Sequence, residues 1–512
     1  MIYKFNHGEN YYIYDVSSNN ILKVEKIIYD IIEEFQSLDL NSSINSGRNS
    51  TIPSLNRIIN KFQTKYSIEM IKKAYNEILF YRKNHGIFTF KKPSAMAFPY
   101  SMTEIMKILN SKLEQLILNV TENCNMRCEY CVYSGKYKYE RTHSKKKMSF
   151  STASRAIEFF FKHNANSERI AVTFYGGEPL LNFSLIRKCV ELSKKLAFKQ
   201  GKDSRLTFSI TTNGTLLDKN KINFLIKNNV GLLISLDGPK DIHDKYRKFI
   251  NGKGSYTLII ESLKRIRELN PEYYKEKVGF SVVTLPEHLD SVVKFFGSYN
   301  LVTETDNLII NMVSTDDTSF FENYDFKTQL RKYRETIRKL RNMYKKYLVE
   351  GNYDSLSFKP LRSLFDKKMI LIHKRLLSMV GEEIYPNGIC LPGSRRLFVS
   401  TDGKFYICEK MGESIRIGDI YNGFDYKTIY ETIQKYQEIS EKNCLNCWLM
   451  RICNLCYVSA RKGNVLERKK KDKYCEGMKT EFSKLMALYC EIIEKNPKIL
   501  SYFDKYDDFN YD

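Results

Sequence analysis

The sequence of 512 residues has no apolar run long enough to cross a bilayer. Its first residues, Met-Ile-Tyr-Lys-Phe-Asn-His, lack the basic-then-apolar plan of a secretory signal peptide. Acidic residues are outnumbered, because 82 Lys and Arg stand against 59 Asp and Glu, giving a formal charge of +23. These features predict a cytoplasmic protein that does not enter a membrane. The charge favours an acidic partner, either a peptide or a nucleic acid, although an AT-rich genome would also raise the lysine content.

The chain is rich in cysteine, with twelve in all. In a protein without an export signal, that many cysteines favour metal binding over the disulfides of a secreted protein. The hydrophobic content of 43% is ample for packed cores, and the length predicts about three domains.

Three of these cysteines, Cys124, Cys128 and Cys131, directly follow an apolar run at 116–120 that we expect to be a buried strand. Three thiolates on one loop can hold three irons of a [4Fe–4S] cube and leave the fourth iron open to a small molecule. Structural zinc is the alternative, but it takes four protein ligands, and no fourth Cys or His lies near these three in the sequence. The C-x3-C-x2-C spacing therefore predicts a cluster with one open position.

This loop resembles the signature of the radical S-adenosylmethionine (SAM) enzymes. The resemblance implies that SAM binds the open iron through its amino and carboxylate groups. It also implies that a reduced cluster cleaves SAM to a 5′-deoxyadenosyl radical, which abstracts hydrogen from a substrate. The electron would come from a low-potential donor such as flavodoxin or ferredoxin.

Residues 110–313 alternate between strand-like and helical patterns. We predict strands at 116–120, 170–175, 206–212, 231–236, 278–284 and 308–313, and helices at 151–165, 182–199, 218–228, 256–269 and 287–298. The predicted fold class is α/β, a partial (β/α)6 radical SAM barrel with its chemistry at the carboxyl ends of the strands.

The second predicted strand is followed by Gly176, Gly177, Glu178 and Pro179. Adjacent glycines let a backbone approach a ligand closely, and a carboxylate can hold an ammonium group. The segment resembles the family's GGEP element, which implies that it grips the methionyl amino group of SAM.

Further candidates follow the third and fourth strands. By resemblance to the sulfatase-maturase branch, Ser235 and Arg247 would contact the ribose and carboxylate of SAM. Asn213 and Asp237 line the same rim, although Asn-Gly and Asp-Gly are also ordinary turn formers. Tyr130 is a candidate packing partner for the adenine ring, or simple cover for the cluster.

The first 95 residues have strand-like runs at 3–5, 11–14 and 21–24, a polar linker at 40–54, and helical patterns before and after that linker. This layout is similar to the winged-helix-like leader-peptide recognition elements of peptide maturases, which add the leader as an extra strand to a sheet edge. A simple brace for the barrel is the alternative. The 314–385 segment reads as a helical bridge with no chemistry of its own.

A second group of cysteines lies in residues 386–512, where the pattern resembles the Cys-rich SPASM extension of radical SAM enzymes. We expect seven cysteines of this part of the chain to lie outside helices, namely Cys390, Cys408, Cys444, Cys447, Cys453, Cys456 and Cys475. The resemblance implies two auxiliary [4Fe–4S] clusters. Cys444, Cys447, Cys453 and Cys475 would enclose the distal one, and Cys390, Cys408 and Cys456 would hold the nearer one. Cys444 to Cys456 have the spacing C-x2-C-x5-C-x2-C. The last gap is one residue shorter than in the SPASM pattern, so the resemblance is weaker for the direction in which Cys456 points. Cys189 and Cys490 remain as residues within helices, and two zinc ribbons are the alternative for the C-x2-C pairs.

The nearer cluster is predicted to be one ligand short, because residues 391–398 contain no cysteine where sulfatase maturases have one. A substrate thiolate could take that position, losing its proton as metal-bound thiols do. Capping by Cys490, a carboxylate or water is the alternative.

The sequence thus predicts a radical SAM maturase that binds a Cys-rich precursor peptide through its leader and forms thioether crosslinks (sactipeptide or ranthipeptide type). No catalytic side chain of the protein is assigned. The alternative is an anaerobic sulfatase maturase that oxidises Cys or Ser to formylglycine, which needs a catalytic acid or base in the cleft. A different class, a non-catalytic electron carrier or RNA-binding protein, would not cleave SAM. Aromatic residues are too sparse in the basic runs for us to expect a nucleic-acid partner.

Overall fold

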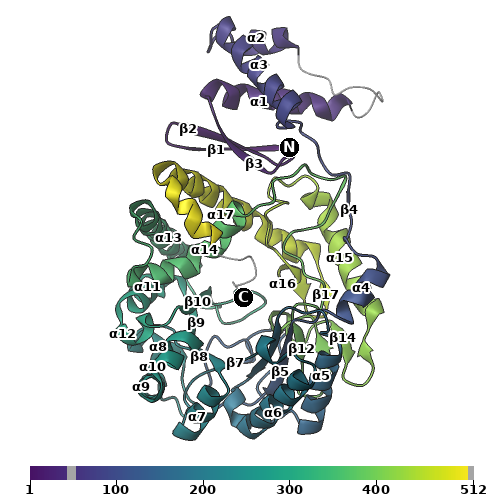
Figure 1. The fold of residues 1–512 in the computed structure, drawn as a ribbon. Helices are drawn as coiled ribbons and strands as arrows, with labels where there is room; N and C mark the ends of the chain where they lie inside the picture. The colour runs from purple at the N-terminus through teal and green to yellow at the C-terminus, as the bar shows by residue number, and fades with distance from the viewer. Residues whose placement is uncertain (43–53, 506–512) are drawn as a thin grey trace.

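The structure of the protein, a computed structural model, describes residues 1–42 and 54–505. Figure 1 shows a small N-terminal domain at one end of the molecule and the strands and helices of a barrel at the other. The long helix α17 (Arg468–Lys495) lies between them, next to the N-terminal sheet. None of the helices in the described ranges has both the length and the apolar character needed to cross a membrane.

The N-terminal domain is a three-stranded antiparallel sheet with helices on one face. Its elements are β1 (Ile2–His7), β2 (Asn10–Asp15), β3 (Asn20–Val24), α1 (Lys26–Ser42), α2 (Leu55–Phe62) and α3 (Ile68–His85). The three predicted strands are confirmed, whereas α2 was not foreseen. Of the predicted linker at 40–54, residues 40–42 end α1, and 43–53 lie outside the described residues.

The N-terminal sheet uses its two faces differently. Ile13 is buried against the domain's own helices, while Tyr12 and Tyr14 face the main core of the protein. Tyr3 stacks on Trp448, with ring centroids 3.8 Å apart, and its hydroxyl donates to Ser483 Oγ at 2.7 Å. The domain therefore docks on the C-terminal part of the chain.

The barrel consists of six parallel strands in the spatial order β10-β9-β8-β7-β6-β5. These are β5 (Gln115–Thr121), β6 (Ile170–Gly176), β7 (Leu206–Thr212), β8 (Val230–Ser235), β9 (Val278–Thr284) and β10 (Asn307–Met312). The helices between them are α5 (Phe150–Lys162), α6 (Phe183–Lys199), α7 (Lys219–Lys227), α8 (Lys240–Tyr246), α9 (Tyr256–Leu269), α10 (Pro271–Lys277), α11 (Leu289–Ser298) and α12 (Asn300–Thr303). All six predicted strands and all five predicted helices are confirmed within a few residues at their ends.

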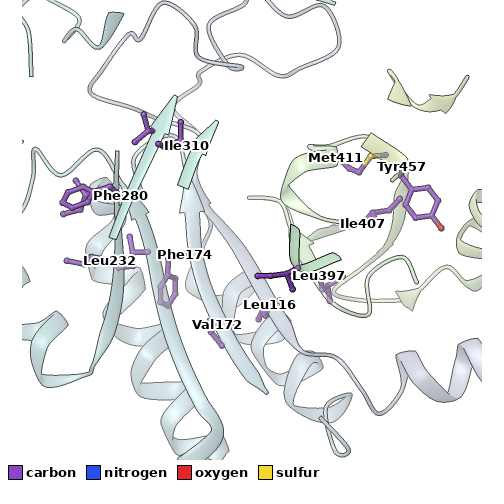
Figure 2. Close-up of a cluster of buried hydrophobic side chains, with 14 of the residues drawn as sticks. Leu116, Val172, Phe174, Leu232, Phe280, Ile310, Leu397, Ile407, Met411 and Tyr457 are labelled. Atoms are coloured by element: carbon purple, nitrogen blue, oxygen red, sulfur yellow. The ribbon is translucent and has the colours of Figure 1, made fainter. Parts of the chain in front are cut away.

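The barrel sheet continues into the C-terminal part of the chain, which the sequence did not predict. The strand β12 (Leu397–Val399) pairs in parallel with β5, with Leu397 opposite Leu116. The antiparallel strands β13 (Lys404–Tyr406), β14 (Arg416–Asp419) and β15 (Gly423–Phe424) follow, giving a ten-stranded sheet. Figure 2 shows the Leu116 and Leu397 side chains close together in one core. The C-terminal part is therefore attached to the strand that precedes the cysteine loop.

The segment between the barrel and the C-terminal part is helical, as expected. It contains α13 (Phe326–Glu350) and α14 (Lys359–His373), which pack on each other and on α17. Asp366 of α14 is fully buried, and it accepts a hydrogen bond from Tyr344 at 2.6 Å and another from Tyr502. Burial of a carboxylate is costly unless it is hydrogen-bonded, so this contact ties the two helices to the chain's last described helix, α18 (Leu500–Asp504).

Two of the seven C-terminal cysteines do not lie outside helices, so that expectation is wrong for them. Cys444 is the last residue of α15 (Tyr426–Cys444), and Cys475 lies within α17. A helix can present a ligand as well as a loop can, because its side chains repeat on one face every three to four residues. Cys189 in α6 and Cys490 in α17 are buried helix residues, as predicted.

Candidate functional site

The loop with Cys124, Cys128 and Cys131 begins three residues after β5 ends, at the carboxyl edge of the sheet. Burial, with a smaller contribution from the charges of neighbouring thiols, raises the pKa of Cys124 to about 12 and that of Cys128 to about 11. Burial also raises the pKa of Cys131. Thiols in this state keep their protons at neutral pH unless a metal replaces them. The donor set therefore fits an iron–sulfur cluster.

The GGEP segment lies directly against the start of this loop. The amides of Gly177 and Glu178 donate to the carbonyls of Thr121 and Asn123, both at 2.8 Å. A Cβ at Gly177 would lie 2.3 Å from the Asn123 carbonyl oxygen, and one at Gly176 would lie 2.3 Å from that of Thr121. Both distances are below van der Waals contact. The two glycines are therefore required for the close approach of this backbone to the cysteine loop.

Glu178 is fully buried, and its carboxylate is held at three points. It accepts from Thr212 Oγ1 at 2.7 Å, from the Asn213 amide at 2.7 Å and from the Leu180 amide at 3.0 Å. Burial raises the pKa of Glu178, and these hydrogen bonds oppose that shift. Pro179 starts the short turn Pro179–Asn182 that follows. Glu178 thus joins the end of β6 to the end of β7.

Asn213 joins the end of β7 to the cysteine loop. Its Nδ2 donates to Asn125 Oδ1 at 2.9 Å, and its Oδ1 accepts from the amide of Thr215 at 3.0 Å. Asn125 lies between the first and second cysteines of the loop. The Asn213 side chain therefore fixes the loop as well as lining the rim.

A buried group made of Tyr130, Asp237 and Arg247 lies on the other side of the loop. The Tyr130 hydroxyl donates to Asp237 Oδ2 and accepts from Arg247 Nη1 at 2.8 Å. Arg247 Nη1 is 3.8 Å from the same carboxylate oxygen, and the Val283 amide donates to Asp237 Oδ1 at 3.0 Å. Burial raises the pKa of Asp237, and the charge of Arg247 opposes that shift. Ser235, the last residue of β8, is half-buried two residues before Asp237.

The structure brings His143 to the cysteine loop, where the sequence placed no histidine nearby. His143 Nε2 lies 3.8 Å from Cys131 Sγ. Burial lowers the pKa of His143, and the charge of Arg127 lowers it further. Twelve residues separate the two side chains, and the intervening segment folds back so that the His143 amide donates to the Tyr133 carbonyl at 3.2 Å. Nothing in the spacing indicates this contact.

Cys390, Cys408 and Cys456 form a second group. Burial raises the pKa of Cys390 to about 11, and Cys456 is the next cause; burial raises that of Cys408 to about 12. Cys490 belongs elsewhere, because its charged neighbours are Arg375, Glu494 and Lys23 near the N-terminal sheet. The structure therefore brings together the three cysteines of the predicted nearer cluster, without Cys490.

A carboxylate that the sequence analysis missed stands beside this group. Glu409 directly follows Cys408, and its Oε1 accepts from Arg396 Nη1 at 2.6 Å. Its Oε2 is buried and has no hydrogen-bond partner. Burial, and then the charge of Glu409, raise the pKa of Tyr175 to about 12, so the carboxylate lies near the carboxyl end of β6. Adjacency to a predicted ligand was the signal that could have identified Glu409.

Cys444, Cys447, Cys453 and Cys475 line one cavity. Cys456 is not among its lining residues, in keeping with its place in the other group. Burial raises the pKa of Cys453 to about 12 and also raises those of Cys447 and Cys475. Lys471, which sequence analysis also missed, lines the same cavity and is 2% exposed. Its position four residues before Cys475 on a helix was the available signal.

Over the described ranges 1–42 and 54–505, no three Cys, His, Asp or Glu side chains converge closely enough to bind one ion. A cube needs a wider spread, because each of its irons takes its own thiolate. Cubes in the three groups stay a prediction.

Comparisons with known proteins agree with this geometry. Residues 118–297 match the sequence profile described as the Radical SAM superfamily. The cysteine-type anaerobic sulfatase-maturating enzyme of Clostridium novyi (strain NT) is 25% identical over 398 residues, covering 73% of this chain and 95% of that protein. The radical SAM cyclopropyl synthase TigE of Paramaledivibacter caminithermalis is 25% identical over 466 residues, covering 87% of this chain and 84% of that protein.

A solved structure shares the fold. It is "Native anSMEcpe with bound AdoMet and Cp18Cys peptide", with a TM-score of 0.53 and 22% identity over 77% of this chain and all of that one. The TigE match covers 87% of this chain, which is more than residues 97–512 make up. The match therefore includes part of the N-terminal domain.

Proposed function

Because this chain is a radical SAM enzyme with its radical SAM domain at residues 118–297, we propose that it joins a cysteine sulfur of a ribosomally made precursor peptide to a carbon of another residue. The product is a thioether crosslink. The observation that carries this proposal is the second cysteine group, where Cys390, Cys408 and Cys456 come together without Cys490. One position of a cube there would be left for a substrate thiolate.

The chain's thiols would hold three clusters. Cys124, Cys128 and Cys131 would hold the [4Fe–4S] cluster that binds SAM, and the two C-terminal groups would hold auxiliary [4Fe–4S] clusters. When bound, the first cluster and SAM supply a 5′-deoxyadenosyl radical after one electron arrives from a donor such as flavodoxin or ferredoxin. Free thiols in this number fit the reducing cytoplasm, where we place the reaction.

The residues around the first cysteine group would position SAM. We assign the methionyl amino group to the backbone of Gly176 to Pro179 with Glu178, the ribose to Ser235 and the carboxylate to Arg247. Tyr130 would pack near the adenine ring, with its hydroxyl already committed to Asp237 and Arg247. Asn213 would hold the cysteine loop in place at the rim through its hydrogen bond to Asn125.

The crosslinking step balances without a further oxidant. A substrate carbon loses a hydrogen atom to the adenosyl radical, and a substrate thiol loses a proton. The carbon and sulfur then form the new bond, and one surplus electron leaves through the auxiliary sites. Tyr175 adjoins the first cysteine group through Cys131, and Glu409 adjoins the second through Cys408. A substrate sulfur held near these two side chains would therefore lie between the two groups.

We assign leader binding to the N-terminal domain. Within the part of the chain that the structure describes, β3 pairs only with β2, while the sheet face bearing Tyr12 is covered by the C-terminal part. An extended leader would add to the β3 edge as a fourth strand. The full precursor should bind at least about tenfold more tightly than a core peptide without its leader. Equal dissociation constants for the two peptides would rule out this assignment.

Formylglycine formation is a second candidate, and one observation favours it. That reaction needs a base in the cleft, and Glu409 offers a buried carboxylate oxygen with no partner beside the second cysteine group. Relatives named as sulfatase-maturating enzymes match most of this chain. The chain would then act on Cys or Ser of a sulfatase.

Mass spectrometry of the product separates these reactions. The enzyme should be reconstituted anaerobically and supplied with SAM, dithionite and the Cys-rich peptide encoded beside its gene. Thioether formation predicts loss of two hydrogens together with loss of the alkylatable thiol. Loss of two hydrogens with the thiol retained would contradict a thioether. Loss of two hydrogens together with replacement of sulfur by oxygen at a cysteine, or loss of two hydrogens at a serine, would establish formylglycine.

A further inference from the structure

Lys471 is a buried lysine in an unusual setting. Its side chain extends from α17 into the cavity lined by Cys444, Cys447, Cys453 and Cys475. Its Nζ lies 3.1 Å from Cys444 Sγ and 5.6 Å from the centre of the Tyr436 ring. A buried ammonium is unfavourable unless an anion or a strong acceptor compensates it.

The neighbouring lysine in the same helix shows ordinary compensation. Lys470 is 7% exposed, and its Nζ lies 3.2 Å from Asp316 and 2.7 Å from Asp317. Lys471 is more deeply buried, and yet its acceptor is a cysteine sulfur. A neutral thiol is a weak acceptor, whereas a metal-bound thiolate is anionic. The contact is therefore favourable only when the sulfur carries negative charge.

The other cation near this cavity is placed differently. Lys479 also lines the cavity, but its side chain is 34% exposed and pairs with Glu476 at 2.7 Å. Solvent and that carboxylate screen its charge. Lys471 is thus the cation whose charge acts on the cysteine group with the least screening.

We propose that Lys471 is the counter-charge of the distal auxiliary cluster, donating a charge-assisted N–H···S hydrogen bond to Cys444 and raising the reduction potential of that cluster. Reduction adds negative charge, and a nearby cation stabilises the reduced form. The inference rests on the distal cluster proposed above and not on the identity of the product. It makes the distal cluster easier to reduce than it would be without Lys471, and so a better receiver for an electron that leaves the substrate.

The test uses the full chain with Cys124, Cys128 and Cys131 replaced by alanine, which leaves only the auxiliary sites. After anaerobic reconstitution this variant should contain about eight irons, by the stoichiometry of two cubes. Redox titration followed by electron paramagnetic resonance then gives the two midpoint potentials. Lys471→Gln should lower one of them, shifting the ratio of oxidised to reduced cluster by about tenfold at fixed potential, or 59 mV.

Two further variants make the result specific to charge. Lys471→Arg keeps the cation and should preserve the potential. Lys470→Gln removes the neighbouring buried lysine, which has carboxylate partners, and should leave both potentials unchanged. If Lys471→Gln loses the distal cluster entirely, retention of about eight irons by Lys471→Arg supports the proposal.

Three outcomes would overturn it. Unchanged potentials in Lys471→Gln would show that the ammonium does not act on the cluster. Equal shifts in the Gln and Arg variants, or cluster loss in both, would show that packing and not charge is responsible. A count of about four irons in the starting variant that stays at about four when Cys444 is also replaced by alanine would remove the distal cluster itself, independently of which product the enzyme makes.

Discussion

At the scale of single residues, Tyr130 shows how the candidate site is held together. It precedes Cys131 in the loop, and its hydroxyl connects Asp237 after β8 to Arg247 after α8. A buried hydrogen-bonded group of this kind keeps its geometry because each unpaired member would be costly. The cysteine loop is therefore fixed to the segments that follow β8 and α8 through a side chain inside the loop.

His143 gives the sharpest residue-level test of the first cysteine group. It stands 3.8 Å from Cys131 Sγ, so it is the described side chain that could serve as a fourth protein ligand. A cube held by three thiolates does not need it, and His143→Ala should retain both iron and SAM cleavage. Iron analysis and 5′-deoxyadenosine measurement check this. The control is His163→Ala, which should keep its iron. If His143→Ala alone lost the metal, the fourth position of the cluster would be filled by His143 and would not be open to SAM.

Cys390 separates the auxiliary chemistry from SAM cleavage. Cys390→Ala removes one thiol of the nearer group, far along the chain from the first cysteine loop. We expect it to retain some 5′-deoxyadenosine formation and to lose crosslinked product. Cys189→Ala, a buried helix cysteine outside all three groups, is the matched control and should keep both activities. Normal product from Cys390→Ala would refute the auxiliary role.

At the scale of elements, the approach of the GGEP segment to the cysteine loop is the contact on which the site depends. In Gly177→Ala the new Cβ would meet the Asn123 carbonyl at 2.3 Å. The backbones must separate, which should cost about 1–3 kcal/mol of unfolding free energy and reduce SAM cleavage. Chemical denaturation measures the first effect and 5′-deoxyadenosine the second.

The control for that substitution is Gly477→Ala in α17, where nothing lies within 4 Å of the added Cβ. It should be neutral or slightly stabilising, because alanine favours a helix over glycine. A Gly177→Ala protein as stable and active as this control would show that the close approach is not required.

The elements also show what sequence could and could not predict. The barrel strands were predictable because each is either an apolar run or an alternation of apolar and polar residues, followed by a turn. β12 was not, because three residues carry no readable periodicity, and its place beside β5 depends on tertiary pairing. The Cys-rich motifs supplied the candidate ligands, which stay predictions, whereas His143 and Glu409 reach their positions only through folding. Lys471 was within reach through its helical spacing to Cys475.

At the scale of the whole molecule, the three cysteine groups lie in one continuous structure, since the barrel sheet extends into the C-terminal part through β12. If all three hold cubes, reconstituted protein should contain about twelve irons per chain. The variant with Cys124, Cys128 and Cys131 replaced by alanine should contain about eight. Iron and sulfide analysis checks both values, and about four irons in the intact chain would remove the auxiliary clusters from the account.

The most direct test of the central claim is the electron paramagnetic resonance spectrum of the reduced protein before and after SAM is added. A cube held by Cys124, Cys128 and Cys131 has one iron free for SAM, so its signal should change shape on addition, and dithionite should then yield 5′-deoxyadenosine. A spectrum indifferent to SAM, in a sample with its full iron content, would contradict an open position at this site.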